Sequence, residues 1–551
     1  MNPNMTTPVS IFNDVIGPVM RGPSSSHCAA ALRIGRIARD LMNSSIHSVL
    51  VEFDRNGSLP TTHDSQGSDM GLFGGLLGWN ADDERLPQSG SFLSDAGIEI
   101  RFETVDVGDP HPNTYRLRLK NDKEEHSIIA ISTGGGMIEI IEIDGFKLSM
   151  LGDYRETLVL LKPNSSCNES ELKTWAKKSL KCDEIVVHSL NDFILVQIKA
   201  RQFWETSDFQ ELRLWGSVVW IKPLDSVLPV MSYYGMQVPF RTCNELVRFA
   251  EDKDVKLWEL AVQYECARGN LSHEKVVDQM IEIVRILRRS IAIGIEGSTY
   301  DDRVLGHQSG RFQEQWQQGK LLGGSMLNRI VLYVTSLMEV KSSMGVIVAA
   351  PTAGACAALP GAVIAVAEEL GLSEEQMAHA LLAAGLIGVF ITGQWTFAAE
   401  VGGCQAEGGA AACMAGAALV TLANGSLKQS LAASSLAFQS MLGLICDPIA
   451  NRVEAPCLGK NVMAASNALC CANMAIADFD PLIPLDEVIW AAKDVASKMP
   501  REHRCTSLGG LAITPTSLKI EQELNLKKSK CGSGCGCAIA PAINSKIAVK
   551  S

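Results

Sequence analysis

The sequence has no long run of lysine or arginine, and acidic residues are in excess over its 551 positions. It contains 49 Lys+Arg against 61 Asp+Glu, so the formal net charge is −12. Nucleic acids and anionic membranes attract basic surfaces, so we exclude both as partners. Apolar residues make up 46% and charged residues 20%, which indicates a globular chain rather than a disordered one.

The N-terminal region lacks the pattern of a secretory signal. Asp14 interrupts its first apolar stretch, and no small-residue cleavage site follows. We therefore expect a cytoplasmic protein whose 16 cysteines stay reduced. Such cysteines are small buried residues, catalytic thiols or metal ligands.

Shifts in composition along the chain predict several domains. Residues 1–152 are expected to form an α/β domain, with a helix over Ala29–Leu41. Residues 153–228 show the β-α-β-β-α-β order of a ferredoxin-like domain. Residues 235–525 predict a large all-α domain, and residues 526–551, which contain CGSGCGC, predict a flexible tail.

The elements expected in the ferredoxin-like stretch are four strands and two helices. The strands are Thr157–Leu161, Glu184–His188, Phe193–Ile198 and Val218–Ile221, and the helices are Glu169–Ser179 and Ser207–Leu214.

One apolar run, Ala380–Ala399, contains twenty uncharged residues and is long enough to span a membrane. Thr392, Gln394 and Thr396 dilute its hydrophobicity, and neither flank carries the Lys/Arg cluster that orients a membrane span. We therefore expect a helix buried on all sides within a bundle. A membrane transporter is the alternative.

Three cysteines stand in glycine- or proline-marked settings: Cys404 in GGCQAEGG, and Cys446 and Cys457 at the two ends of CDPIANRVEAPC. Intervals of 41 and 10 residues separate them, whereas zinc sites pair ligands two to four residues apart. Three thiolates brought together by the fold, with one coordination position free, suit an iron–sulfur cluster. The spacing alone is also compatible with three cysteines that are simply buried core residues.

The sequence around these cysteines resembles the catalytic chain of the iron–sulfur L-serine dehydratases. The resemblance is carried by SSMGVIVAAPTAGACAALPG, CQAEGG, CDPIANRVEAPC and MPREHRCTSLGGLAITPT. The N-terminal part resembles the partner chain of the same enzymes, through IFNDVIGPVMRGPSSSHCAAALRIGRIAR, GLLGWNADDERLP, HPNT and TGGGMIEIIEIDGF. The arrangement looks like the two-chain form fused into one polypeptide.

The resemblance implies a [4Fe–4S] cluster on Cys404, Cys446 and Cys457, with the fourth iron left for the substrate. In some single-chain relatives a C-terminal cysteine occupies that open position. In this tail, the candidates for that open position are Cys531, Cys535 and Cys537. Pyridoxal phosphate is not expected, because no lysine has the setting of a Schiff-base lysine, although Thr133–Gly136 could pass for a phosphate loop.

Three histidines are the candidate catalytic groups, because histidine exchanges protons near neutral pH. His27 and His111 match family positions, whereas Gln66 stands where the family has a histidine. Glutamine is no base, and His63, three residues earlier, is the candidate substitute, with an ordinary turn histidine as the alternative. Two short segments are expected to bind the substrate carboxylate, one at a helix N-terminus. Their residues are Ser24, Ser25, Ser26, Thr352, Ala353 and Gly354.

The predicted architecture is therefore a substrate-binding α/β domain, a ferredoxin-like domain of the ACT type and an all-α catalytic domain. The predicted function is dehydration and deamination of L-serine to pyruvate and ammonia, as part of amino-acid catabolism and gluconeogenesis, by a homodimer. The alternatives are a lyase for another β-substituted amino acid or hydroxy acid, such as cysteine, and an inactive amino-acid sensor.

Overall fold

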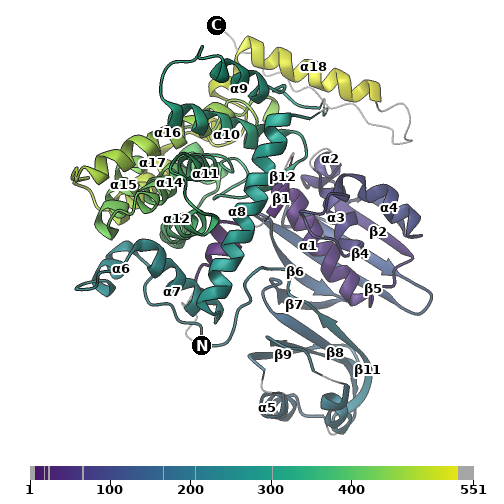
Figure 1. The fold of residues 1–551 in the computed structure, drawn as a ribbon. Helices are drawn as coiled ribbons and strands as arrows, with labels where there is room; N and C mark the ends of the chain where they lie inside the picture. Colours follow the sequence, from purple (N-terminus) through teal and green to yellow (C-terminus); the bar gives the residue numbers. More distant parts are fainter. Residues whose placement is uncertain are drawn as a thin grey trace.

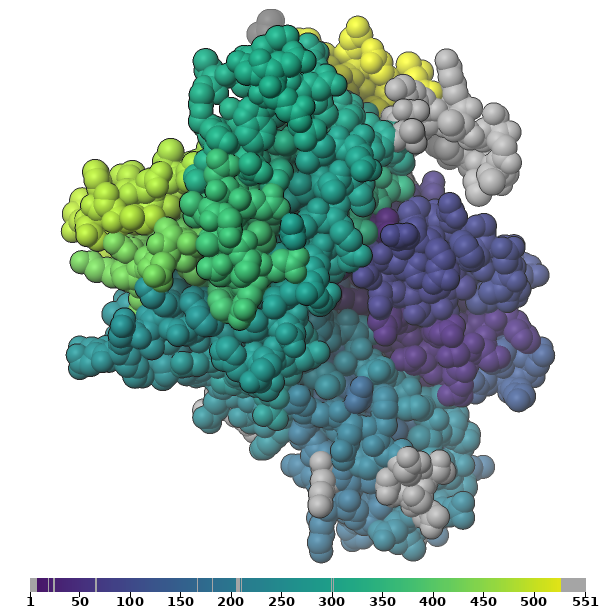
Figure 2. Space-filling model, viewed as in Figure 1, coloured from purple at the N-terminus to yellow at the C-terminus, as the bar shows by residue number. Residues whose placement is uncertain are grey.

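The computed structural model describes residues 7–17, 19–22, 25–64, 67–165, 167–180, 182–204, 206–298, 300 and 302–531. A mostly helical part and two β-sheets make up the molecule (Figure 1). The larger sheet and its helices lie against the helical part, and the smaller sheet forms a lobe at one end (Figures 1 and 2).

The larger sheet has six strands in the order β3-β2-β4-β5-β6-β7, of which only the β2–β3 pair is parallel. Along β5 the side chains alternate between buried and exposed, as expected when one face of a sheet covers a core. The strands are β2 Ser48–Asp54, β3 Glu99–Val105, β4 Thr114–Lys120, β5 Glu125–Gly134, β6 Met137–Ile143 and β7 Phe146–Met150. The helices are α1 Ser25–Leu41, α2 Leu59–Thr62, α3 Ser68–Leu76, the 3₁₀ helix η2 Leu86–Gln88 and α4 Ser89–Asp95.

Helices α1 and α3 pack closely because glycines stand at their contact. A Cβ atom on Gly71 would lie 2.1 Å from the carbonyl oxygen of Cys28, and one on Gly75 would lie 2.2 Å from that of Leu32. The expected helix Ala29–Leu41 is confirmed and begins four residues earlier. Its buried side chains cover the sheet.

The smaller sheet has the order β11-β8-β10-β9, with all neighbours antiparallel. This is the order that the split β-α-β pattern predicts. Its elements are β8 Arg155–Pro163, α5 Glu169–Ser179, β9 Glu184–Leu190, β10 Phe193–Ala200, η3 Thr206–Leu214 and β11 Gly216–Leu224. The second expected helix is a 3₁₀ helix, η3.

The two faces of β8 serve two cores. Val159 and Leu161 pack with α5, whereas Leu158 packs into the core of the larger sheet. Alternation along the strand therefore joins the smaller lobe to its neighbour.

From Cys243 onward the described chain is helical, apart from loops and the short strand β12 Val346–Val348. The α-helices that precede Cys404 are α6 Cys243–Phe249, α7 Leu257–Gly269, α8 His273–Glu296, α9 Ser309–Gln317, α10 Ser325–Ser342, α11 Ala358–Glu369, α12 Glu374–Gln394 and α13 Ala399–Gly402. The later ones are α14 Ala410–Leu422, α15 Leu427–Gln439, α16 Cys457–Ile476, α17 Leu485–Lys498 and α18 Pro515–Cys531. Short π or 3₁₀ turns are η4 Gln405–Gly409, η5 Ile449–Asn451, η6 Arg501–His503 and η7 Gly510–Ile513.

Helix α12 contains most of the apolar run. Among the described residues it is the one helix whose length and hydropathy would suit a membrane span, and 78% of its apolar window is buried in the protein. Burial in the bundle explains its composition, as expected.

The N-terminal segment, which precedes the α/β part in the sequence, packs within the helical part. Its π turn η1, Ile11–Val15, packs on α12, where Cβ atoms on Gly385 and Gly388 would meet the side chains of Ile11 and Val15 at 2.5 and 2.1 Å. Strand β1, Val19–Arg21, then pairs with β12. Residues expected only in the N-terminal domain therefore help to build the helical core.

At the other end, α18 continues to Cys531, so residues 526–531 are helical. Cys535 and Cys537 lie outside the described residues.

Candidate metal centre

The three cysteines named from the sequence stand on three segments of the helical part. Cys404 lies between α13 and η4, Cys446 lies in extended chain after α15, and Cys457 is the first residue of α16. The Sγ atoms of Cys404 and Cys446 and a carboxylate oxygen of Glu407 all lie within 4.8 Å of one another. Cys457 is outside this group of three, but it interacts with Cys404: burial, and then that thiol, raise the pKa of Cys457 to about 12.

Gln405 holds the first two segments together. Its backbone N–H donates to the carbonyl of Leu444 at 3.0 Å, and its side-chain oxygen accepts from the N–H of Gly443 at 2.9 Å. The segment that carries Cys446 is thereby fixed beside Cys404. The π turn that follows Cys404 presents Glu407 on the same side, and such turns are frequent at functional sites.

Lys460, one turn after Cys457 on α16, brings a positive charge to the thiols. Its Nζ lies 3.7 Å from Cys404 Sγ and donates to Asp447 Oδ1 at 2.6 Å. Burial lowers the pKa of Lys460, but Cys404 and Asp447 outweigh it and raise the pKa overall.

Glu407 is a site residue that sequence reasoning missed, although its motif CQAEGG was noted. Its Oε1 accepts a hydrogen bond of 2.6 Å from Thr352 Oγ1, and burial raises the pKa of Glu407 to about 7. A Cβ atom on Gly354 would lie 2.7 Å from the same carboxylate. The expected segment Thr352, Ala353 and Gly354 therefore borders the metal centre through Glu407.

Lys341 connects the centre to the N-terminal part. Its side chain is 1% exposed, its Nζ donates to the carbonyl of Val453, and its charge acts on Cys457 and Glu407. A Cβ atom on Gly22 would lie 1.8 Å from the carbonyl oxygen of Lys341. The chain that leads to the expected serines thus passes directly beside α10.

The expected serines begin helix α1. Ser24 lies outside the described residues, Ser25 is buried and its Oγ has no hydrogen-bond partner among the described residues, and Ser26 is half-buried. An unpartnered buried hydroxyl is costly unless something else bonds it, so Ser25 is available for a ligand atom.

The three candidate histidines occupy different surroundings. His63 follows α2, its Nδ1 lies 2.8 Å from Asp69 Oδ1, and its ring stacks on Phe102. His27 lies in α1, where burial lowers its pKa. His111 lies in the β3–β4 loop and accepts a hydrogen bond from the N–H of Asn113 at 3.2 Å. The carboxylate of Asp69 orients the ring of His63.

The loop after His63 faces the helical part. Burial and nearby carboxylates, Asp64 among them, raise the pKa of Tyr300. The same tyrosine interacts with Arg452 and Glu454, shortly before Cys457. Gln66, in the same loop, lies outside the described residues.

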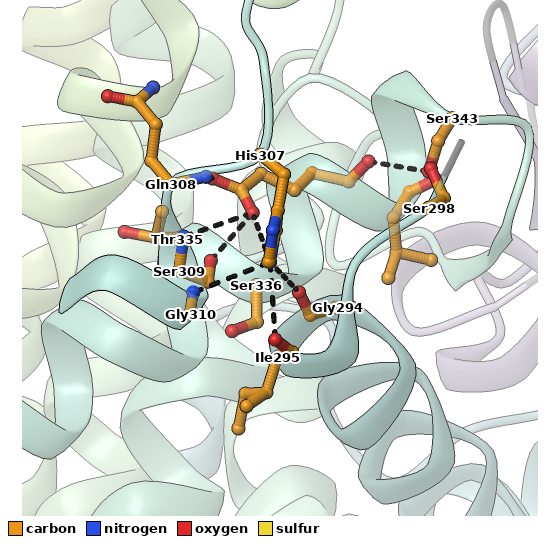
Figure 3. A network of polar contacts seen from close by, with 12 residues as sticks. Gly294, Ile295, Ser298, His307, Gln308, Ser309, Gly310, Thr335, Ser336 and Ser343 are labelled. Atoms are coloured by element: carbon orange, nitrogen blue, oxygen red, sulfur yellow. Dashed lines mark hydrogen bonds and ion pairs between the residues drawn. The ribbon is translucent and has the colours of Figure 1, made fainter. Parts of the chain in front are cut away.

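A polar network anchors the segment that carries Tyr300 (Figure 3). The buried carboxylate of Glu339 accepts from the N–H of Gln308 at 2.9 Å and from Ser309 Oγ at 2.8 Å. The ring of His307 lies between this carboxylate and the end of α8. Further along, Glu454 Oε2 accepts from the N–H of Val304 at 2.8 Å. The segment 302–309 is therefore held by Glu339 and by Glu454, three residues before Cys457.

The donor set fits an iron–sulfur cluster. Thiolate ligands select such clusters, and the three cysteines are 5%, 3% and 6% exposed, so the site is shielded from water. The described cysteines form no disulfides. Thr133–Gly136, in contrast, comprises the end of β5 and the two-residue turn before β6, and no helix follows it as in a phosphate-binding loop.

Comparison with known proteins decides the family. A family model for the serine dehydratase alpha chain matches residues 252–512. A probable L-serine dehydratase alpha chain of Bacillus subtilis is 36% identical over 285 residues, which are 52% of this chain and 95% of the relative. The chain belongs to the serine dehydratase family. The L-serine dehydratase alpha chain of Peptoniphilus asaccharolyticus is 33% identical over 51% of this chain and 97% of its own length.

The beta-chain resemblance is also confirmed. A probable L-serine dehydratase beta chain of Bacillus subtilis is 42% identical over 151 residues, 27% of this chain and 67% of the relative. This member of the family thus joins an alpha-like and a beta-like part in one polypeptide.

Proposed function

We propose that this protein is an iron–sulfur L-serine ammonia-lyase that converts L-serine to pyruvate and ammonia. The observation that carries the proposal is the meeting of Cys404, Cys446 and Glu407 beside Cys457 in a chain of this family. The cofactor is a [4Fe–4S] cluster on the three cysteines, and it supplies a Lewis acid for the leaving hydroxyl group. Lys460 supplies a positive charge beside that centre, and the burial of the three cysteines shields it from water.

His63 takes the α-proton of the substrate in this proposal. Asp69 accepts the Nδ1 proton of His63, so Nε2 is the nitrogen left to act as a base. This is the same division of labour that a carboxylate imposes on a catalytic histidine in hydrolases.

Glu407 holds the second proton. A carboxyl with a pKa near 7 is protonated in part of the molecules at neutral pH, and Thr352 fixes its Oε1. Glu407 then donates that proton to the departing hydroxyl as water leaves. The enamine product rearranges to an imine, which water hydrolyses to the 2-keto acid and ammonia.

The substrate is held by groups from both parts of the chain. Lys341 supplies a positive charge for the carboxylate, and the hydroxyls of Ser25 and Ser26 at the start of α1 supply hydrogen bonds. Ser24, His27 and His111 are proposed to complete the pocket.

We also propose roles for the domains of the chain, its localisation and its oligomeric state. Residues 1–152 form the beta-like substrate-binding domain, residues 153–228 an ACT-type domain that joins two copies of the chain, and residues 235–525 the catalytic domain. The protein acts in the cytoplasm as a homodimer on a small amino acid.

The test is anaerobic purification, iron and sulfide analysis, and a 2-keto acid assay on L-serine, L-threonine, L-cysteine and D-serine. The proposal expects about four irons per chain and turnover of L-serine above the other substrates. An intact cluster without turnover of any of them would show a sensor instead.

A further inference from the structure

A fourth cysteine reaches the metal centre from a segment far along the chain. The thiol of Cys446 is within hydrogen-bonding range of both Cys404 and Cys505. Cys505 also packs against the small apolar cluster that contains Cys404 and Cys446. Neither its spacing from the other cysteines nor its motif, MPREHRCTSLGG, singles it out.

The backbone places Cys505 beside Cys446 by direct pairing. The N–H of Cys446 donates to the carbonyl of His503 at 2.9 Å, and the N–H of Cys505 donates to the carbonyl of Cys446 at 3.2 Å. The two segments form a single parallel bridge between Cys446 and Arg504. The position of the thiol therefore follows from main-chain bonds and not from one side-chain rotamer.

Cys505 has a left-handed backbone, with φ of 60°. This conformation is uncommon for a residue with a Cβ atom and is held only when the surroundings impose it. Three anchors surround it: Arg504 Nε donates to the carbonyl of Met499 at 2.8 Å, Ser507 Oγ to that of Pro448 at 2.9 Å, and the N–H of Leu511 to Asp447 Oδ2 at 2.9 Å.

We propose that Cys505 is a fourth thiol ligand of the centre and binds the iron that Cys404, Cys446 and Cys457 leave open. This inference rests on the proposed function. A cubane of four irons has four corners, and four thiolates saturate it. Ligation releases one proton from sulfur as an Fe–S bond forms. For the substrate to reach that iron, the bond breaks and the sulfur takes up a proton, with no electron transferred.

The partial exposure of Cys505 fits this exchange. The other three cysteines are buried, whereas Cys505 is half-buried. A ligand that must leave and return is best placed at the exposed side of a site, so Cys505 is the thiol that L-serine displaces.

The test uses the full chain, purified anaerobically and reconstituted with ⁵⁷Fe and sulfide. The main variant is Cys505→Gly, because glycine adopts a φ of 60° without strain and the thiol is removed at no cost to the backbone. Cys505→Ser retains the shape of the side chain, and Cys266→Ala is the matched control, a half-buried cysteine on α7.

The readout is the Mössbauer spectrum before and after L-serine, and the iron content after mild ferricyanide oxidation. We expect four similar irons in the wild type and one distinct iron in Cys505→Gly, which then loses about one iron of four on oxidation. The KM for L-serine should fall about 10-fold in Cys505→Gly, since no thiol competes with the substrate.

One distinct iron already present in the wild type, with the same spectrum in Cys505→Gly, would overturn the inference even if the enzyme turns over L-serine. A change of spectrum in Cys505→Gly without turnover in any form would instead uphold the ligand and reject the proposed function.

Discussion

Two carboxyl groups whose pKa is raised by burial, Glu407 and Glu156, lie in different surroundings. Glu407 lies at the metal centre against Thr352 and two thiols, and Glu156 lies on β8 between the two sheets. Glu156 Oε2 accepts from Gln197 Nε2 at 2.6 Å, whereas its Oε1 has no partner in the described structure. Burial raises the pKa of both carboxyls, to about 7 for Glu407 and to about 8 for Glu156.

The comparison teaches that a raised pKa in a buried acid does not by itself mark a catalytic site. The groups that surround a buried acid decide whether it can take part in chemistry. Glu407 adjoins the cysteines that we propose as metal ligands, whereas Glu156 adjoins the amide of Gln197 and the charges of Lys199, Asp153 and Glu184. We therefore expect changes around Glu407 to affect chemistry and changes at Glu156 to affect only stability.

The largest effect is expected from Cys446→Ala. Loss of one thiol of the centre should remove the iron and, with it, several kcal/mol of transition-state stabilisation, a loss in kcat of about 10³-fold or more. Iron analysis and the 2-keto acid assay measure both. Cys413→Ala, a buried cysteine of α14, is the control and should keep its iron. Equal iron in the two variants would contradict the assignment.

Glu407→Gln should reduce kcat by about 10³-fold, within the range for loss of a general acid, while the iron content stays unchanged. The amide still accepts the hydrogen bond of Thr352 but has no proton to donate. Glu400→Gln, an exposed acid seven residues earlier, serves as control. If Glu407→Gln lost its iron instead, Glu407 would be a ligand and not an acid.

His63→Gln should lower kcat by about 10²-fold, the lower end of the effect of a general base. Solvent exchange of the α-proton of L-serine, followed by NMR in deuterated water, should slow by the same factor. The control is His47→Gln, an exposed histidine of the same part, which should leave exchange unchanged. Normal exchange in His63→Gln would move the base to another residue.

The smallest effect on activity is expected from Glu156→Gln. The folded protein keeps the Glu156 proton up to a pH of about 8, while the unfolded chain releases it near its usual pKa of 4.5. Stability therefore falls as the pH rises from 4.5 to about 8 and then levels off. Each unit of pKa difference corresponds to about 1.4 kcal/mol.

The variant removes this cost, so its free energy of unfolding should exceed that of the wild type by several kcal/mol at pH 9 and little at pH 5. Denaturant titrations at both pH values measure it, with the exposed Glu171→Gln as control. A loss of activity in Glu156→Gln at equal stability would reverse the comparison.

Much of the fold was predictable because local patterns carry it. The residue pattern of α1 and the long uncharged run of α12 predict helices, and the strand order of the smaller sheet follows from the order of its elements. The second helix of that sheet is a 3₁₀ helix, and α18 extends past the expected start of the tail. Local propensity determines neither the type of η3 nor the end of α18, because tertiary packing overrides it.

The site was predictable only in part. Cys404, Cys446 and Cys457 stand in marked motifs, so the sequence points to them. Glu407, Lys460 and Cys505 become visible only when segments more than 40 residues apart meet, and the same holds for the pairing of β1 with β12. Such contacts leave no local pattern.

The central claim is that the three sequence-marked cysteines hold one cluster. Anomalous scattering at the iron absorption edge, from crystals grown without oxygen, tests it most directly. The account predicts a single iron peak within bonding distance of the Sγ atoms of Cys404, Cys446 and Cys457. A fully reconstituted protein whose iron peak lies elsewhere, with these sulfurs bonded to no metal, would contradict it.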